Sequence, residues 1–259
     1  MDNTSFIHPN AKIGAGVEIG PFCYIAEHVE IGDGCKIGPH ATIYDYVKMG
    51  KGCSVFPGAV IGAIPQDLKF DGEETWVEIG DYTNIRECAT INRGTGASGK
   101  FKTTVGSNCL IMSYVHIAHD CRVGNHVILS SYTGLAGEAE VDDWAICGGG
   151  SLVHQFTHIG AHAMLGGSSA VNKDLPPFAI ASRFPAVFET VNIVGMRRRG
   201  FSNEQIEEVR SIYRTLYESG LNVSEACEKI AAEFKQTAER DLILNFIKNS
   251  PRGIVKPGK

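Results

Sequence analysis

Large aliphatic residues recur at every sixth position through the middle of the chain. The series is unbroken from Val105 to Val171, and a small residue such as Cys109 or Ala139 stands two positions before each member. An α-helix places apolar residues with a period of about 3.6 and a half-buried strand with a period of about two, so neither explains this spacing. A fixed six-residue repeat is typical of a solenoid built from many similar turns.

The same repeat covers the N-terminal part of the chain and is broken twice. It begins at Ile7 and continues to Ile61, where a polar insertion at 63–76 interrupts it. Three further repeats end at Ile91, and a glycine-rich insertion follows at 93–102. Loops that interrupt a solenoid project from its surface and often carry function. We therefore expect both insertions to contribute to a functional site.

Each repeat can form a short strand and a tight turn, and three repeats can close one triangular coil. The next coil then stacks about 4.8 Å away, with the large residues inside. Each buried aliphatic side chain contributes about 1.5–3 kcal/mol, so many stacked coils are needed to offset the entropy of ordering the chain. Glycines such as Gly14, Gly32, Gly50 and Gly62 follow the large residues, where we expect turns that use positive φ. The pattern predicts a mainly β fold, a β-solenoid, for residues 1–184.

The C-terminal part of the chain has a helical pattern. Two prolines at 176–177 end the six-residue repeat. The segments Ser-Asn-Glu-Gln at 202–205 and Asn-Val-Ser-Glu at 222–225 are capping boxes that predict two helices, and the apolar spacing at 238–249 predicts a third. Residues 185–259 are therefore expected to form a small α-helical domain.

Composition and charge exclude several classes of protein. The net charge of −5 leaves no basic excess for a general nucleic-acid binder. No apolar run is long enough for an integral membrane segment, so a cytoplasmic location is the default expectation. Six of the eight cysteines occupy apolar positions of the repeat and no Cys-x-x-Cys motif occurs, which favours packed thiols over disulfides or a metal site.

Stacked coils bring together residues that are eighteen apart in the sequence. His119 and Gly137 have this separation, and so do Gly137 and Gln155. A histidine base one coil from a glycine N–H is an arrangement suited to acyl transfer, because the base can activate a nucleophile while the N–H stabilises an oxyanion. The carboxylate of Asp120 is adjacent and can orient the imidazole.

Two other functions fit the same histidines. Three histidines on a solenoid of this kind can bind zinc, and His116, His119 and His154 could supply the ligands of a zinc-dependent hydratase of the carbonic-anhydrase type. The histidines could also decorate the exterior of a purely structural or binding solenoid. Spacing alone leaves these alternatives open.

An ordered set of motifs resembles those of the UDP-N-acetylglucosamine 3-O-acyltransferase family. The resemblance covers nearly the whole chain, including both insertions and the helical tail. Its motifs are Pro-Gln-Asp-Leu-Lys at 65–69, Val-His-Ile-Ala-His-Asp-Cys at 115–121, Leu-Ala-Gly at 135–137, Val-His-Gln-Phe at 153–156 and Asn-Ile-Val-Gly-Met-Arg-Arg-Arg-Gly at 192–200.

The resemblance implies a fold, an assembly and a reaction. It implies a left-handed parallel β-helix that assembles as a homotrimer, with active sites in the clefts between neighbouring solenoids. The implied reaction is the first step of lipid A biosynthesis, in which an (R)-3-hydroxyacyl group passes from acyl carrier protein to the 3-hydroxyl of UDP-N-acetylglucosamine. No metal or cofactor is implied, because the phosphopantetheine thioester of acyl carrier protein is itself the donor substrate.

The resemblance also implies roles for individual residues. His119 would be the general base, Asp120 would hold its imidazole, and the Gly137 N–H would stabilise the oxyanion. Gly167 would lie at the position that sets the length of the acyl chain, and because it has no side chain we expect a long groove and a long 3-hydroxyacyl donor. Residues expected to bind the sugar nucleotide or the acyl phosphopantetheine are Gln66, Asp67, Lys69, His116, His154, Gln155, Asn192 and Arg198.

Three positions depart from the common pattern of that family. Asn92 and Glu138 stand where histidine is usual, and Val194 replaces a glutamate. The contacts made there are expected to differ, and the motifs leave open whether the acceptor carries a 3-hydroxyl or a 3-amino group. The arginine run at 197–199 could pair with Glu204 and Glu208 or could dock acidic acyl carrier protein.

Overall fold

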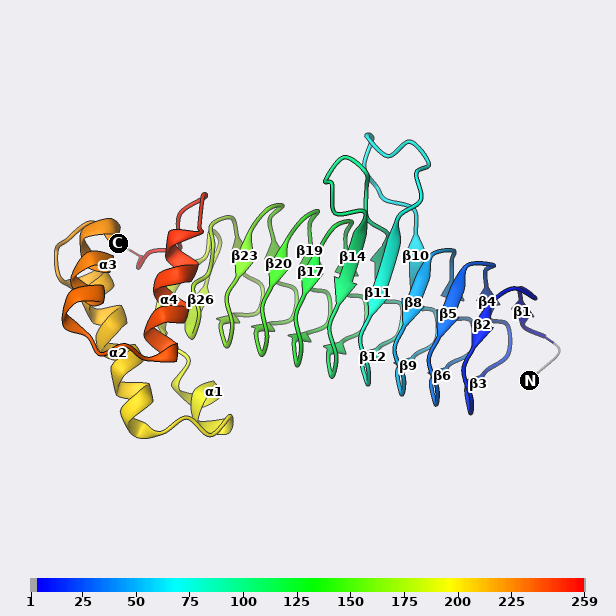
Figure 1. The fold of residues 1–259 in the computed structure, drawn as a ribbon, viewed down its shortest axis with the longest axis horizontal. Helices are drawn as coiled ribbons and strands as arrows, with labels where there is room; N and C mark the ends of the chain where they lie inside the picture. The colour runs from blue at the N-terminus through cyan, green and yellow to red at the C-terminus, as the bar shows by residue number, and fades with distance from the viewer. Residues whose placement is uncertain (1–3, 259) are drawn as a thin grey trace.

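The six-residue repeats form short parallel strands that wind into a long triangular solenoid (Figure 1). The computed structural model describes residues 4–258, and its strands lie in three sheets, called A, B and C here. Strands of one sheet pair with the equivalent strands of the adjacent coils: His116 pairs with Gly134, and Ile117 with Leu135. The stacking expected for residues eighteen apart is therefore confirmed.

The strand bounds follow the repeat along the chain. Sheet A contains β1 (Phe6–Ile7), β4 (Tyr24–Ile25), β7 (Thr42–Ile43), β10 (Val60–Ala63), β13 (Thr90–Asn92), β16 (His116–Ile117), β19 (Gly134–Leu135), β22 (Leu152–Val153) and β25 (Ala170–Val171). Sheet B contains β2 (Lys12–Ile13), β5 (Val29–Ile31), β8 (Val47–Met49), β11 (Trp76–Ile79), β14 (Lys102–Val105), β17 (Arg122–Val123), β20 (Glu140–Val141) and β23 (His158–Ile159). Sheet C contains β3 (Glu18–Ile19), β6 (Lys36–Ile37), β9 (Ser54–Val55), β12 (Asn84–Ile85), β15 (Leu110–Ile111), β18 (Ile128–Leu129), β21 (Ile146–Cys147), β24 (Met164–Leu165), β26 (Ala179–Ser182) and β27 (Val187–Val191).

The interior of the solenoid is filled by the large and small residues of the repeat. Ile117, Leu135 and Val153 stack in successive coils and are fully buried. The small position is equally buried, and at Cys109 the thiol donates to the carbonyl oxygen of Gly124 at 3.0 Å. All eight cysteines are free thiols, and the six within the repeat are buried, as the packed-thiol interpretation predicts.

The glycines that follow the large residues have a different role from the one predicted. Positive φ is found at Gly62, but Gly14, Gly32 and Gly50 do not adopt it. Most residues with positive φ stand three positions after the large residue, and many of them are not glycine. A Cβ on Gly32 would lie 2.6 Å from the carbonyl carbon of Gly50. These glycines are therefore required because the backbones of adjacent coils approach each other closely.

Both insertions leave the solenoid at the corner between sheets A and B, called the A–B corner here. The first connects β10 to β11 and the second connects β13 to β14, one coil further on. They project side by side from one edge of the solenoid (Figure 1). This position sets them beside the next A–B corner, which contains His119 and Asp120.

The outer faces of the sheets differ in polarity. Sheet B carries a ladder of opposite charges, with Lys102 2.9 Å from Glu78 and Arg122 2.8 Å from Glu140. On β15, β18, β21 and β24 of sheet C, and at Ile180 of β26, the outward residues are apolar instead. These side chains form a half-exposed apolar stripe consisting of Leu110, Ile128, Ile146, Met164 and Ile180.

Four helices within the described residues follow the solenoid. They are α1 (Ile193–Arg198), α2 (Asn203–Glu218), α3 (Val223–Glu233) and α4 (Ala238–Lys248). The predicted capping boxes of α2 and α3 are present, and the third predicted helix is α4. No helix within residues 4–258 is long and apolar enough to cross a membrane. The division at residue 184 stays a prediction, and β27 beyond it still pairs antiparallel with β26.

Candidate active site

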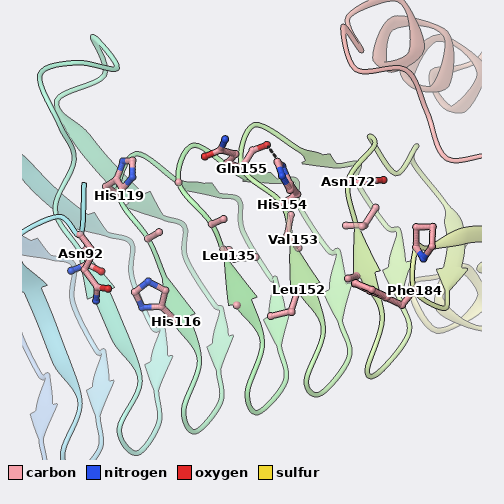
Figure 2. A pocket seen from close by; sticks show the side chains of 18 residues that line it. Asn92, His116, His119, Leu135, Leu152, Val153, His154, Gln155, Asn172 and Phe184 are labelled. Carbon is pink, nitrogen blue, oxygen red and sulfur yellow. Dashed lines mark hydrogen bonds between the residues drawn. The ribbon is translucent and has the colours of Figure 1, made fainter. Parts of the chain in front are cut away.

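A groove of about 850 Å³ runs along the outer face of sheet A and its A–B corner (Figure 2). Gln66 and Asn92 lie at one end, and Phe184 and Pro185 close the other. The groove crosses the coils that contain β16, β19, β22 and β25, so it follows the stacking direction. Three coil spacings of about 4.8 Å separate β16 from β25, which makes the groove roughly 14 Å long over these strands.

The surface of this groove is formed mainly by small and apolar residues. Ala118, Gly134, Ala136, Leu152 and Ala170 line it between Asn92 and Phe184. A long trough with so few polar groups suits a hydrocarbon chain better than a polar ligand.

His119 lies at the polar end of the groove, at the A–B corner after β16. Its Nδ1 is 2.8 Å from Oδ2 of Asp120, and its Nε2 is 3.8 Å from Oδ2 of Asp67. The side chain is 18% exposed. The imidazole is therefore held on one side by a carboxylate of its own coil and faces a carboxylate of the first insertion on the other.

Gly137 occupies the equivalent corner of the next coil, directly against the His119 ring. A Cβ at Gly137 would lie 2.5 Å from both Cε1 and Nε2 of His119. Glycine is therefore needed for the ring to lie here. Within residues 4–258 the Gly137 N–H donates to no protein acceptor. The predicted proximity of His119 and Gly137 is confirmed.

Asp120 is almost completely enclosed, with 1% of the residue exposed. Its carboxylate accepts hydrogen bonds from the Thr95 N–H at 2.8 Å, the Thr95 hydroxyl at 2.7 Å and the Ser98 hydroxyl at 2.6 Å. Thr95 and Ser98 belong to the second insertion, so this loop covers the residue that holds His119. The sequence interpretation missed both, because the insertion breaks the eighteen-residue spacing.

The two insertions are bonded to each other beside the histidine. Oε1 of Glu73 in the first insertion accepts the Gly96 N–H of the second at 2.6 Å. This bond, first among its causes, holds the pKa of Glu73 below its ordinary value. Arg93 lies between the rings of Tyr46 and Phe70, at 5.1 and 5.6 Å from their centroids. The loop that carries Asp67 is therefore anchored to the loop that covers Asp120.

Two further predicted histidines line the groove. His116 points outward from β16, and its Nδ1 lies 2.7 Å from the Thr90 hydroxyl. Burial lowers the pKa of His116, and the neighbouring His119 lowers it further. His154 follows β22, and its Nδ1 lies 3.0 Å from the carbonyl oxygen of Gln155, which also lines the groove (Figure 2).

Six predicted residues do not line the groove of their own chain. Asp67 and Asp120 contact His119, whereas the other four lie elsewhere. Lys69 is exposed in the first insertion, and Arg198 is exposed at the end of α1. Asn192 is buried as the cap of α1, where Oδ1 accepts the Gly195 N–H and Nδ2 donates to the carbonyl of His162. Gly167 is exposed at a corner between sheets C and A. Their substrate contacts stay predictions.

The residues that depart from the family pattern take individual roles. Asn92 is buried at the groove end and donates through Nδ2 to the carbonyl of Ile64 at 2.9 Å. Glu138 lies 3.9 Å from the Lys100 ammonium of the second insertion. Val194 is 59% exposed on α1. Of these, Asn92 is part of the groove surface.

The histidines do not assemble a metal site within the described chain. No group of three or more His, Cys, Asp or Glu side chains in residues 4–258 is arranged to hold a metal ion. His119 uses Nδ1 for Asp120, and His116 uses Nδ1 for Thr90.

Comparison with known proteins identifies the family. The family model described as Udp N-acetylglucosamine O-acyltransferase, domain 2, matches residues 174–255, and the bacterial transferase hexapeptide model matches 3–33, 10–45, 28–63 and 102–137. An acyl-(acyl-carrier-protein)-UDP-N-acetylglucosamine O-acyltransferase of Thiobacillus denitrificans is 47% identical over 253 residues, which cover 98% of each chain. The chain belongs to the UDP-N-acetylglucosamine O-acyltransferase family. A Pseudomonas putida protein of the same name is 45% identical over 256 residues and 99% of each chain.

Solved structures of UDP-N-acetylglucosamine acyltransferases have the same fold. The Bacteroides fragilis enzyme superposes with a TM-score of 0.97 at 50% identity, covering 99% of this chain and 100% of the other. The Francisella novicida enzyme has a TM-score of 0.96 at 37% identity, covering 100% and 94%. These matches confirm the left-handed parallel β-helix. They give no support to the zinc hydratase, and that alternative is set aside.

Proposed function

We propose that this chain transfers an (R)-3-hydroxyacyl group from acyl carrier protein to the 3-hydroxyl of UDP-N-acetylglucosamine, the first step of lipid A biosynthesis. The observation that carries the proposal is the His119 imidazole at the polar end of an apolar groove, held by Asp120 and packed against Gly137, whose N–H donates to no acceptor within residues 4–258. A base, an oxyanion donor and a hydrocarbon trough are the parts that acyl transfer from a thioester to a hydroxyl requires.

The reaction follows from this geometry. Nε2 of His119 removes the proton of the sugar 3-hydroxyl while that oxygen attacks the thioester carbonyl carbon. Negative charge develops on the carbonyl oxygen, and the Gly137 N–H stabilises it, a contribution typically of about 10²- to 10³-fold in rate for one donor. The intermediate then collapses, the carbon–sulfur bond breaks, and the imidazolium returns the proton to the leaving thiolate. Asp120 keeps the imidazole oriented throughout.

The groove residues divide between the two substrates. We assign the apolar stretch from Gly134 to Ala170 to the acyl chain. Gln66, Asp67 and His116 lie around the base and are suited to the sugar. The side chains of Lys69 and Arg198 make no ion pair among the described residues, so they are free to bind phosphate.

A homotrimer is part of the proposal. The apolar stripe of sheet C and the groove face of sheet A lack the ion pairs that make the outer face of sheet B a suitable solvent-exposed surface. A stripe of five neighbouring apolar side chains marks a surface that another chain covers. Packing sheet C of one copy against the edge of sheet A of the next would close the groove and could bring Asn192 and Arg198 to a site of a neighbouring copy.

Acyl carrier protein is the proposed partner, and the side chain of Arg252 lies at the edge of the groove. Arg252 donates to the carbonyl of Asn172 at 3.3 Å, and both Asn172 and His154 line the groove. Arg197 and Arg198 are exposed on α1, and within residues 4–258 neither pairs with Glu204 or Glu208. These cations suit an acidic protein. The cytoplasmic location stays a prediction.

The acyl chain is proposed to be long. Gly167 has no side chain to shorten a groove, and a Cβ there would meet the Gly149 carbonyl oxygen at 3.2 Å. Replacing Gly167 with methionine is expected to shift the preferred donor to a shorter chain. The measurement is kcat/KM for a series of hydroxyacyl carrier proteins, and an unchanged preference would remove Gly167 as the residue that limits length.

One assay tests the proposed activity. The purified protein is incubated with UDP-N-acetylglucosamine or its 3-amino analogue and a panel of 3-hydroxyacyl carrier proteins, and the products are weighed by mass spectrometry. We expect an ester of UDP-N-acetylglucosamine with a long 3-hydroxyacyl chain. Absence of any acylated nucleotide, with a family enzyme active in the same mixtures, would contradict the proposal.

A further inference from the structure

Two hydroxyl groups of the second insertion are oriented toward Asp120 by backbone donors. The Thr95 hydroxyl oxygen accepts the Ser98 N–H at 3.3 Å, and the Ser98 hydroxyl oxygen accepts the Lys100 N–H at 3.0 Å. Each hydroxyl oxygen therefore accepts one hydrogen bond, and its own hydrogen is left to donate to another acceptor. For Ser98 the Asp120 carboxylate at 2.6 Å is closer than the Thr95 carbonyl at 3.1 Å, and a charged acceptor forms the stronger bond.

These hydroxyls and one amide take up most of the acceptor capacity of Asp120. A carboxylate has about four lone-pair sites. The Thr95 N–H and the Ser98 hydroxyl bind Oδ1, and the Thr95 hydroxyl binds Oδ2. The remaining site on Oδ2 faces Nδ1 of His119 at 2.8 Å. Because every partner donates to this carboxylate, the fourth contact requires a hydrogen on Nδ1.

The position of that hydrogen decides whether His119 can act as a base. With the hydrogen on Nδ1, the lone pair of Nε2 is directed to the groove. Asp67 lies 3.8 Å from Nε2 and would favour the opposite tautomer, in which Nε2 carries the hydrogen and cannot accept a proton. The imidazole thus lies between two carboxylates, and only the one at Nδ1 is fixed by three donors.

We infer that Thr95 and Ser98 are positioning residues that select the active tautomer of His119 by fixing the Asp120 carboxylate. The inference rests on the proposed acyltransferase function, because it assigns these residues to the base of that reaction. It gives the second insertion a specific task. The insertion covers the A–B corner so that its hydroxyls reach a carboxylate that the solenoid alone would leave without these donors.

The test combines kinetics with a direct observation of the ring. We would compare wild type with Thr95→Val, Thr95→Ser, Ser98→Ala and the control Thr104→Val, which makes the same change on the outer face of sheet B in β14. The ring nitrogens are followed by ¹⁵N NMR of protein labelled in histidine, and the His119 signals are identified by their loss in His119→Ala.

Wild type, Thr95→Ser and Thr104→Val are expected to show the hydrogen on Nδ1. Thr95→Val is expected to gain the Nε2–H form and to lose about 10- to 100-fold in kcat, the effect of one hydrogen bond to a charged group. KM for both substrates should stay within about twofold, because no binding contact is removed. If the substitution instead unfolded the second insertion, KM for the acceptor should rise. The bond from the Gly96 N–H to Glu73 would be lost, and with it the support for the first insertion, which carries Asp67.

Two results would overturn the inference. One is a folded Thr95→Val or Ser98→Ala protein that keeps both the Nδ1–H form and the kcat of wild type. The other is Thr95→Ser being as impaired as Thr95→Val, which would show that the hydroxyl is irrelevant. Should Thr95→Val fail to fold, Ser98→Ala carries the test. Failure of the wild-type protein to transfer acyl groups would refute the proposed function, while the NMR comparison would still decide the tautomer.

Discussion

The environment of His119 is assembled from three separate parts of the chain. Asp120 comes from the same corner, Gly137 from the next coil, and Asp67 from the first insertion. The first two contacts could be predicted from the sequence, because residues one or eighteen positions apart have fixed relations in a regular coil. The third could not, because the path of a fourteen-residue insertion is independent of the repeat.

Removing the imidazole tests the base directly. His119→Ala is expected to lower kcat by about 10²- to 10⁴-fold, the usual contribution of a positioned general base. The measurement is steady-state kinetics with saturating donor and acceptor. His40→Ala, which removes an exposed histidine stacked on Phe22, is the matched control and should retain activity. A folded His119→Ala protein with near wild-type kcat would exclude the mechanism.

His162 links the solenoid to the C-terminal helices and is sensitive to pH. Its ring stacks 5.1 Å from Phe178, meets Phe201 edge-on at 5.1 Å, and buries an Nδ1 that has no partner among the described residues. Burial, with a smaller effect of the Arg199 charge, lowers the pKa of His162 to about 4. The folded protein therefore holds the neutral ring at pH values where the unfolded chain, with an ordinary pKa of about 6.5, binds a proton.

The sign of this effect predicts lower stability in acid. The contribution of His162 is complete above pH 6.5 and is lost as pH falls toward 4. The Tm of wild type should fall between pH 7 and pH 5, and His162→Phe should fall less, because phenylalanine keeps the stack and binds no proton. Calorimetry at several pH values checks this. Parallel Tm curves for the two proteins would show that another group is responsible.

At the scale of one coil, the spacing between backbones depends on glycine. A Cβ on Gly106 would lie 2.5 Å from the carbonyl oxygen of Gly124, and neither backbone can move without separating the coils. The sequence identified these positions but not their reason, since a six-residue period shows where a turn falls and not how closely the next coil approaches. The positive φ that turns require is instead adopted by residues such as Trp144 and Asp120.

Gly106→Ala should therefore destabilise the solenoid. We expect a loss of about 1–3 kcal/mol or more in the free energy of unfolding, the usual effect of overpacking. Gly34→Ala is the comparison, because Gly34 has a φ of +67° with open space around it. Its loss should be about 1 kcal/mol, from the left-handed backbone alone. Urea unfolding would rank the two, and a smaller effect at Gly106 would contradict the close-approach argument.

The whole molecule has one polar face and a groove whose outer side a monomer leaves open. The positions of charged and apolar residues within the repeat could have been read from the sequence, because every outward residue precedes a large one. The contacts of Asn192 and Arg198 could not be derived from coil spacing in the same way. In the proposed trimer these contacts depend on how copies pack, and a repeat carries no information about the angle between two solenoids.

Assembly is predicted to depend on the apolar stripe of sheet C. Ile146→Glu introduces a charge at its centre, which a buried interface does not tolerate without a partner. The variant is expected to run as a smaller species in analytical ultracentrifugation and to lose activity with the trimer. Thr104→Glu on the charged face of sheet B is the control and should keep the assembly. A monomeric wild type, or a trimeric Ile146→Glu protein, would contradict the proposed interface.

The length of the groove between His119 and Phe184 is determined by the number of coils that lie between these residues. A single substitution in the wall changes the trough at one point, by the length of one side chain, whereas adding or deleting an eighteen-residue coil between β19 and β25 would move its far end by about 4.8 Å. The register of every other strand would be unaffected. The length of the groove in such a scaffold can therefore change in steps of one coil to fit substrates of different size, while the residues around His119 stay the same.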